Sequence, residues 1–258
     1  MELGNNVFPL YLKNGSLSRV VLAINYLYVK TSILVKPRFI SIPFLFLSDP
    51  GLSAIMIGIK THTKNFSMKH EYYHFLVQAE ELKMQNKHRE AIELCQQILM
   101  NDLTCLEAFE EIGDNYISLR AYSKSKKALE KALELNRRSA NANYLYGFVF
   151  SAQHDWENAI KYLEFANTYQ PNHPEVLRCL GWAYFCSGLR KKGLAILERA
   201  LVLAPSDSYV LCDLGICHLN DRSFDRAMEL FGRTLQVDPE NIKAKECLKI
   251  AQMFKQTV

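Results

Sequence analysis

The sequence lacks the signatures of several protein classes. Its 258 residues contain no uninterrupted apolar run near the length of about 20 residues that a transmembrane helix requires. There is no P-loop, no G-x-G-x-x-G after a strand and no G-x-S-x-G, so the common nucleotide-binding and hydrolase motifs are absent. The seven cysteines form no CxxC pair, which argues against a zinc ribbon or a disulfide framework. We expect free thiols that fill small apolar spaces in a reducing compartment.

Charge is scarce in the first quarter of the chain and plentiful after it. Residues 1–67 hold seven Lys/Arg and two Asp/Glu, a net charge of +5. Residues 68–258 hold 24 Lys/Arg and 25 Asp/Glu, a net charge of −1. Because the long second part has no excess of positive charge, we expect no nucleic-acid partner.

Residues 1–67 form an apolar, basic segment whose structure the pattern does not define. Its two apolar stretches, residues 20–29 and 39–48, are each about half as long as a membrane span. Three interpretations remain open: a membrane-associating segment, a small irregular packed extension, or a misassigned start that precedes translation from Met68. We expect a cytoplasmic protein that becomes membrane-associated if this segment is real and inserts.

From Met68 onward, small residues recur every 34 positions. One series opens the pattern: Gly113, Gly147, Gly181 and Gly215. A second series follows twelve residues after it: Ser125, Ala159, Gly193 and Ala227. Each 34-residue unit is typical of two antiparallel helices, because helical spacing runs over residues 177–184, breaks at Gly188 and resumes over residues 194–201. The small residues would let the two helix axes approach closely, and Pro171, Pro205 and Pro239 would end the second helices.

This pattern resembles the tetratricopeptide repeat family. The fourth unit carries these motif residues: Leu177, Leu180, Gly181, Tyr184, Gly193, Leu197, Ala200 and Pro205. The resemblance implies an all-α fold, a right-handed α-α superhelix of five helix pairs within a domain over residues 68–258. The units run over residues 72–105, 106–139, 140–173, 174–207 and 208–241, and a capping helix follows over residues 242–258.

The resemblance also implies a concave face lined by the first helix of each pair. We predict that this face forms a groove for a segment of a partner protein. The predicted groove residues are Glu107, Glu110, Asp114, Tyr144, Phe148, Arg178, Trp182, Phe185 and Tyr209. Carboxylates gather at one end and aromatic side chains at the other, and aromatic residues with polar neighbours are typical of peptide-binding surfaces. The alternative is that these aromatic side chains pack within the array.

Some members of the family hold the carboxy-terminal tails of heat-shock chaperones with a clamp of Lys, Asn and Arg. The corresponding positions here include Glu80, Glu110 and Asp114, whose carboxylates would repel such a tail. We therefore expect no binding of acidic chaperone tails.

One catalytic pattern is present, His70-Glu71-x-x-His74, which resembles the zinc metalloproteases. It overlaps the first unit, and the longer form of the motif would need different residues at Val77 and Glu80. We therefore predict a non-enzymatic adaptor, scaffold or chaperone-like module without catalytic residues, metal or cofactor, whose partner is a protein or peptide. The alternatives are a membrane-anchored zinc protease and a membrane-tethered assembly scaffold, and the sequence defines no oligomeric state.

Overall fold

The computed structural model describes residues 72–256, and these residues are helical with no strand among them. Residues 72–84 form the first described helix. It is followed by α3 (His88–Asn101), α4 (Leu106–Ser118), α5 (Tyr122–Leu135), α6 (Ala140–Ala152), α7 (Trp156–Tyr169), α8 (Pro174–Cys186), α9 (Arg190–Leu203), α10 (Ser208–Asn220), α11 (Phe224–Val237) and α12 (Ile242–Gln256). The three interpretations of residues 1–67 concern a segment outside the described residues.

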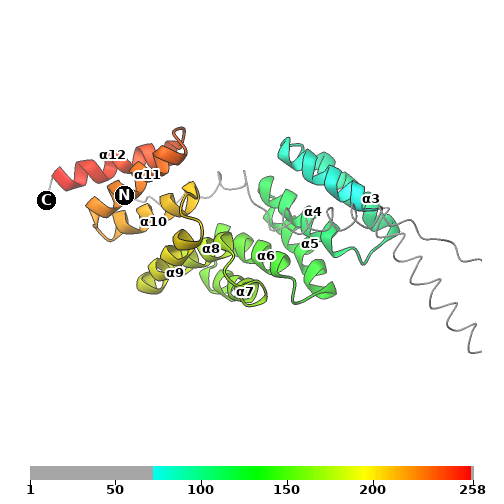
Figure 1. The fold of residues 1–258 in the computed structure, drawn as a ribbon. Helices are drawn as coiled ribbons and strands as arrows, with labels where there is room; N and C mark the ends of the chain where they lie inside the picture. The colour runs from blue at the N-terminus through cyan, green and yellow to red at the C-terminus, as the bar shows by residue number, and fades with distance from the viewer. Residues whose placement is uncertain (1–71, 257–258) are drawn as a thin grey trace, which may run out of the picture.

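Consecutive helices pack as pairs, and each pair packs against the next. The strongest packing joins α4 to α5, α6 to α7, α8 to α9 and α10 to α11, while α12 lies against α11 and α10. Within each pair from α4 onward, the first helix has 13 residues and the second has 14. Figure 1 shows the array as an arc, with α6 and α8 nearer its inner side than α7 and α9. The predicted solenoid of helix pairs with a final capping helix is confirmed.

The regular spacing of the glycines has a steric cause. A β-carbon on Gly181 would lie 2.8 Å from Leu197 Cγ and 2.9 Å from the carbonyl oxygen of Gly193, which is closer than van der Waals contact allows. In the other pairs the same position meets the side chain sixteen residues later, as Gly215 meets Phe231 at 2.7 Å. The expectation that small residues mark the closest approach of paired helices is therefore correct.

The turn inside each helix pair contains one residue with a positive φ angle. These residues are again 34 apart: Asn86 (61°), Arg120 (56°), His154 (60°), Gly188 (94°) and Arg222 (58°). The sequence marks only Gly188 as a turn, because glycine is the residue that accepts this conformation without steric cost. Because the connection between the two helices of each pair is short, the chain must turn tightly there. The other four residues therefore adopt the left-handed conformation although they carry side chains.

The cysteines behave as small apolar residues. All seven are free, and Cys95, Cys179, Cys212 and Cys217 are buried in the described array. Burial raises the pKa of Cys212 to about 12 and that of Cys105 to about 11, so the thiols stay protonated at neutral pH. The described helices include none with the length and apolar character needed to cross a bilayer.

Candidate functional site

The predicted groove residues lie on the first helices, where neighbouring units meet. A residue on one first helix contacts a residue 31 positions later, on the first helix of the next pair. Asn141 Nδ2 donates to Glu110 Oε2 at 2.8 Å, and Tyr144 Oη donates to Glu175 Oε1 at 3.0 Å. One unit further, the Arg178 guanidinium lies 5.9 Å from the centre of the Tyr209 ring. A row of side-chain contacts therefore joins α4, α6, α8 and α10.

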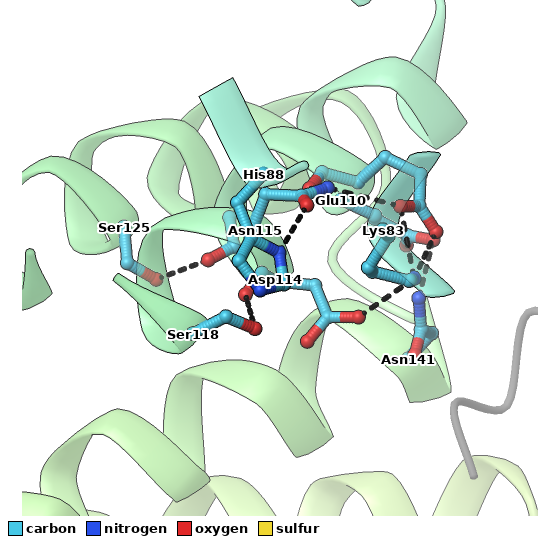
Figure 2. Close-up of polar contacts among 10 residues, drawn as sticks. Lys83, His88, Glu110, Asp114, Asn115, Ser118, Ser125 and Asn141 are labelled. Carbon is cyan, nitrogen blue, oxygen red and sulfur yellow. Dashed lines mark hydrogen bonds and ion pairs between the residues drawn. The ribbon is translucent and has the colours of Figure 1, made fainter. Parts of the chain in front are cut away.

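Figure 2 shows the N-terminal end of this row, where Lys83 reaches two carboxylates of α4. Lys83 Nζ lies 2.7 Å from Glu111 Oε1 and 2.9 Å from Asp114 Oδ2. Burial raises the pKa of Glu111, the attraction of Lys83 lowers it in part, and the repulsion of the neighbouring Asp114 carboxylate raises it again. Burial opposes the charge on Lys83, yet the two carboxylates keep its pKa above the ordinary value.

Glu110 occupies the next contact between units and is also buried. Ser139 Oγ donates to Glu110 Oε1 at 2.5 Å, and Asn141 Nδ2 donates to the other carboxylate oxygen. The same Ser139 oxygen accepts the backbone N–H of Ala142 at 3.1 Å and thereby caps α6. Burial raises the pKa of Glu110, although its two side-chain hydrogen bonds act in the opposite direction.

Arg178 holds the C-terminal half of the row together. Its guanidinium donates to Glu175 through Nε at 2.8 Å and through Nη2 at 2.6 Å, and it reaches Asp213 Oδ2 on α10 at 2.6 Å. Lys243 of α12 lies 3.9 Å from Asp213 and 5.7 Å from the centre of the Trp182 ring. Because Arg178 is 4% exposed and Asp213 2%, this charge network lies almost entirely out of water.

The structure places the nine predicted groove residues in three degrees of exposure. Six are buried: Glu110, Asp114, Tyr144, Phe148, Arg178 and Phe185. Trp182 and Tyr209 are half-buried, and Glu107 is exposed. The buried side chains contact their neighbours in the array, while the last three can reach a partner without rearrangement. A role for these residues in partner binding stays a prediction.

Sequence reasoning missed Glu111, Ser139 and Asp213, which complete the contacts between units. Helical spacing identifies which residues share a face of one helix, but these three contacts depend on the neighbouring unit. Their partners lie 28, 29 and 35 positions away, so a search at the 31-residue separation that links Glu110 to Asn141 would not have found them.

Two of the three defining residues of the zinc-protease pattern, His70 and Glu71, lie outside the described residues. His74 is described, and its ring centre lies 4.0 Å from that of Phe75. Within residues 72–256, the His, Cys, Asp and Glu side chains form no group of three or more that could hold a metal ion.

Comparisons with known proteins agree with this architecture. A family model described as "Tetratricopeptide repeat" matches residues 106–139, the bounds predicted for the second unit. BBSome complex member BBS4 of Bos taurus is 27% identical over 150 residues, which are 58% of this chain and 29% of that protein. The chain thus spans less than a third of this curated relative.

Two solved structures show the same fold. A thermophilic TPR protein of Thermus thermophilus matches with a TM-score of 0.62 at 16% identity, over 70% of this chain and 99% of the other. YrrB, described as a TPR protein with an unusual peptide-binding site, matches with a TM-score of 0.52 at 19% identity, over 68% and 90% of the two chains.

The stacked helix pairs define a helical-repeat protein of the class that serves as protein–protein interaction scaffolds. The match of the family model over residues 106–139 and the 34-residue spacing of the glycines at the helix crossings identify the described helix pairs as tetratricopeptide repeats.

Proposed function

We propose that residues 68–258 form a non-enzymatic scaffold of five units and a cap, which binds a segment of a partner protein along its first helices. The observation that carries this proposal is the pair of half-buried aromatic residues Trp182 and Tyr209 on adjacent first helices. Half-buried aromatic side chains offer a large apolar contact area and lose little conformational entropy on binding.

The charge network beside these rings supports the proposal. Arg178 lies 5.9 Å from the Tyr209 ring and is held by Glu175 and Asp213, and Lys243 lies over the Trp182 ring. These contacts fix the orientation of both rings before a partner arrives. A preorganised surface avoids part of the ordering cost that otherwise weakens binding.

The N-terminal end of the row favours a basic flank on the partner. Glu107 is exposed on α4, and the nearby buried Glu111 and Asp114 share the ammonium of Lys83. A lysine or arginine side chain of the partner would complement this negative charge. The bound segment would therefore carry a basic residue toward α4 and apolar residues toward α8 and α10.

Affinity capture of the full chain from its native cells, with identification of the partner by mass spectrometry, provides the ligand for the test. We expect W182A and Y209A each to weaken binding of that partner at least tenfold in calorimetry, with unchanged helical circular dichroism. The matched control is W156A on the second helix α7, which should leave the affinity unchanged. Equal affinity of all four proteins would refute binding at the first helices.

A further inference from the structure

An exposed aromatic residue on the outer side of the array breaks the pattern of the repeat. Phe165 on α7 is 41% exposed. The residues at the same position of the other second helices are Gln97, Lys131, Arg199 and Arg233, all long and polar. The packing of a helix pair therefore does not require a ring here. Exposing one to water forgoes the free energy that its burial would supply.

Phe165 belongs to a connected set of rings, which we term the outer aromatic row: Tyr146, Phe150, Tyr162, Phe165 and Tyr169. The Tyr162 ring stacks on Phe150 at 5.5 Å and lies 6.2 Å from Phe165, which in turn stacks on Tyr169 at 6.4 Å. Tyr146 is buried at one end of the row, and Tyr169 is 40% exposed at the other. The exposed rings are thus supported from behind by packed rings, as suits a rigid contact surface.

Positive charge adjoins the outer aromatic row on α5. Lys126 Nζ lies 4.0 Å from the centre of the Phe150 ring, and the exposed Lys127 follows it on α5. Lys124 lies on another side of the helix, 5.6 Å from the centre of the Tyr116 ring on α4. The first turn of α5 contains no acidic residue, so these cations stand at the positive end of the helix dipole. Among the described residues, no carboxylate forms an ion pair with any of the three lysines. Anionic groups of a bound partner would offset the repulsion between these lysines and the positive end of the helix dipole.

The two carboxylates of α5 serve other contacts. Glu130 accepts the Tyr146 hydroxyl at 2.7 Å, and Glu134 pairs with Lys131 at 2.6 Å. The positive charge of Lys126 and Lys127 therefore remains available beside the outer aromatic row. The contacts that link Lys126 to Phe165 through Phe150 and Tyr162 together span less than about 16 Å, a length that five extended residues cover.

We propose that the outer face of α5, α6 and α7 is a second binding surface, which takes an acidic segment of a partner protein. An aromatic or leucine side chain of that segment packs on Phe165 and Tyr169, and its carboxylates lie beside Lys126 and Lys127. A short acidic segment suits this patch better than nucleic acid does, because Glu157 and Glu164 on α7 would repel a continuous phosphate backbone. This surface is separate from the first-helix row, so the test of one binding surface does not decide the other.

The test uses the full chain as bait for a phage-displayed library of random 16-residue peptides. We expect the enriched peptides to carry net negative charge and at least one aromatic residue or leucine. For the tightest of them, fluorescence anisotropy should show at least tenfold weaker binding to F165Q, which introduces the residue type of the first unit. K126Q/K127Q should also weaken binding and flatten its dependence on salt.

Two controls make the result specific. R233Q changes the equivalent position of α11 and W182A changes the first-helix row, and both should bind the peptide with unchanged affinity. F165Q should keep the helical circular dichroism of the unmodified protein and lose only a small part of its melting temperature, because Phe165 is 41% exposed and glutamine stands at the same position of α3. Enrichment of uncharged or basic peptides, binding that is insensitive to F165Q, or preferential Phe165-dependent binding of a poly(U) oligonucleotide would each overturn the proposal.

Discussion

At the scale of single residues, buried polar side chains connect neighbouring units through hydrogen bonds and ion pairs. Glu110 on α4 is an example. Its carboxylate accepts hydrogen bonds from Ser139, which precedes α6, and from Asn141, which lies in the first turn of α6. Burying a carboxylate is costly unless such bonds replace its hydration. The two hydrogen bonds replace the lost hydration of Glu110 only in part, since burial still raises its pKa.

The raised pKa of Glu110 predicts a pH-dependent contribution to stability. Between the ordinary value of 4.5 and the higher pKa of the folded state, the folded protein binds a proton that the unfolded chain has released. The contribution of Glu110 to the free energy of unfolding therefore falls as pH rises through this window. We expect E110Q to gain stability relative to the unmodified protein as pH rises from the ordinary value of 4.5 to about neutral, measured by urea unfolding at several pH values.

The lowered pKa values of His173 and His218 have the opposite sign but occur in both proteins, so they cancel in this comparison. Burial is the main cause for both histidines. A stability difference between E110Q and the unmodified protein that does not change with pH would contradict a raised pKa for Glu110.

At the scale of helices, two glycines in regular helix occupy opposite environments. A β-carbon on Gly181 of α8 would collide with Leu197 and with the Gly193 carbonyl, whereas one on Gly232 of α11 would meet nothing within 4 Å. Alanine generally stabilises a helix relative to glycine by about 0.5–1 kcal/mol. We expect G232A to raise the free energy of unfolding by about that amount and G181A to lower it by about 1–3 kcal/mol through overpacking.

Urea unfolding of the two single variants measures both effects, and each serves as the control for the other. The shared substitution removes helix propensity as an explanation for their difference. Equal shifts in the two proteins would show that the close approach at Gly181 does not determine how the pair packs.

The helices and their pairing were predictable because both depend on features that repeat locally. Small residues at Gly147 and Ala159, and Pro171 after the second helix, indicate one unit without knowledge of its neighbours. The positive φ angles of Arg120 and Arg222 were not predictable from residue type, since neither residue favours that conformation.

The exposure of the candidate site was the part that the sequence could not supply. Helical spacing places Phe148 and Trp182 on the same side of successive first helices, but the neighbouring helices bury Phe148 to 5% exposure and leave Trp182 half-buried. Comparison of equivalent positions between units would have singled out Phe165, because it needs only the register of the repeat.

At the scale of the whole molecule, each pair contacts mainly its neighbours, so a local defect should remain local. Arg178 on α8 joins Asp213 on α10 through a contact that is almost fully buried. Replacing Arg178 with methionine would remove this 2.6 Å ion pair, and the ammonium of Lys243 lies farther from Asp213, at 3.9 Å. Breaking a buried ion pair in this way generally costs about 3–5 kcal/mol.

We therefore expect R178M to accelerate amide hydrogen exchange in α8, α10 and α12, with α4 and α5 nearly unchanged. Mass spectrometry of peptides from the full chain measures this, since exchange reports the free energy of local opening. The matched control is R226M, which removes an exposed pair with Glu229 within α11 and should leave exchange as it is. Equal acceleration in α4 and α10 would instead mean that the array opens as one cooperative unit, and Arg178 would then stabilise the whole solenoid rather than the junction between its fourth and fifth pairs.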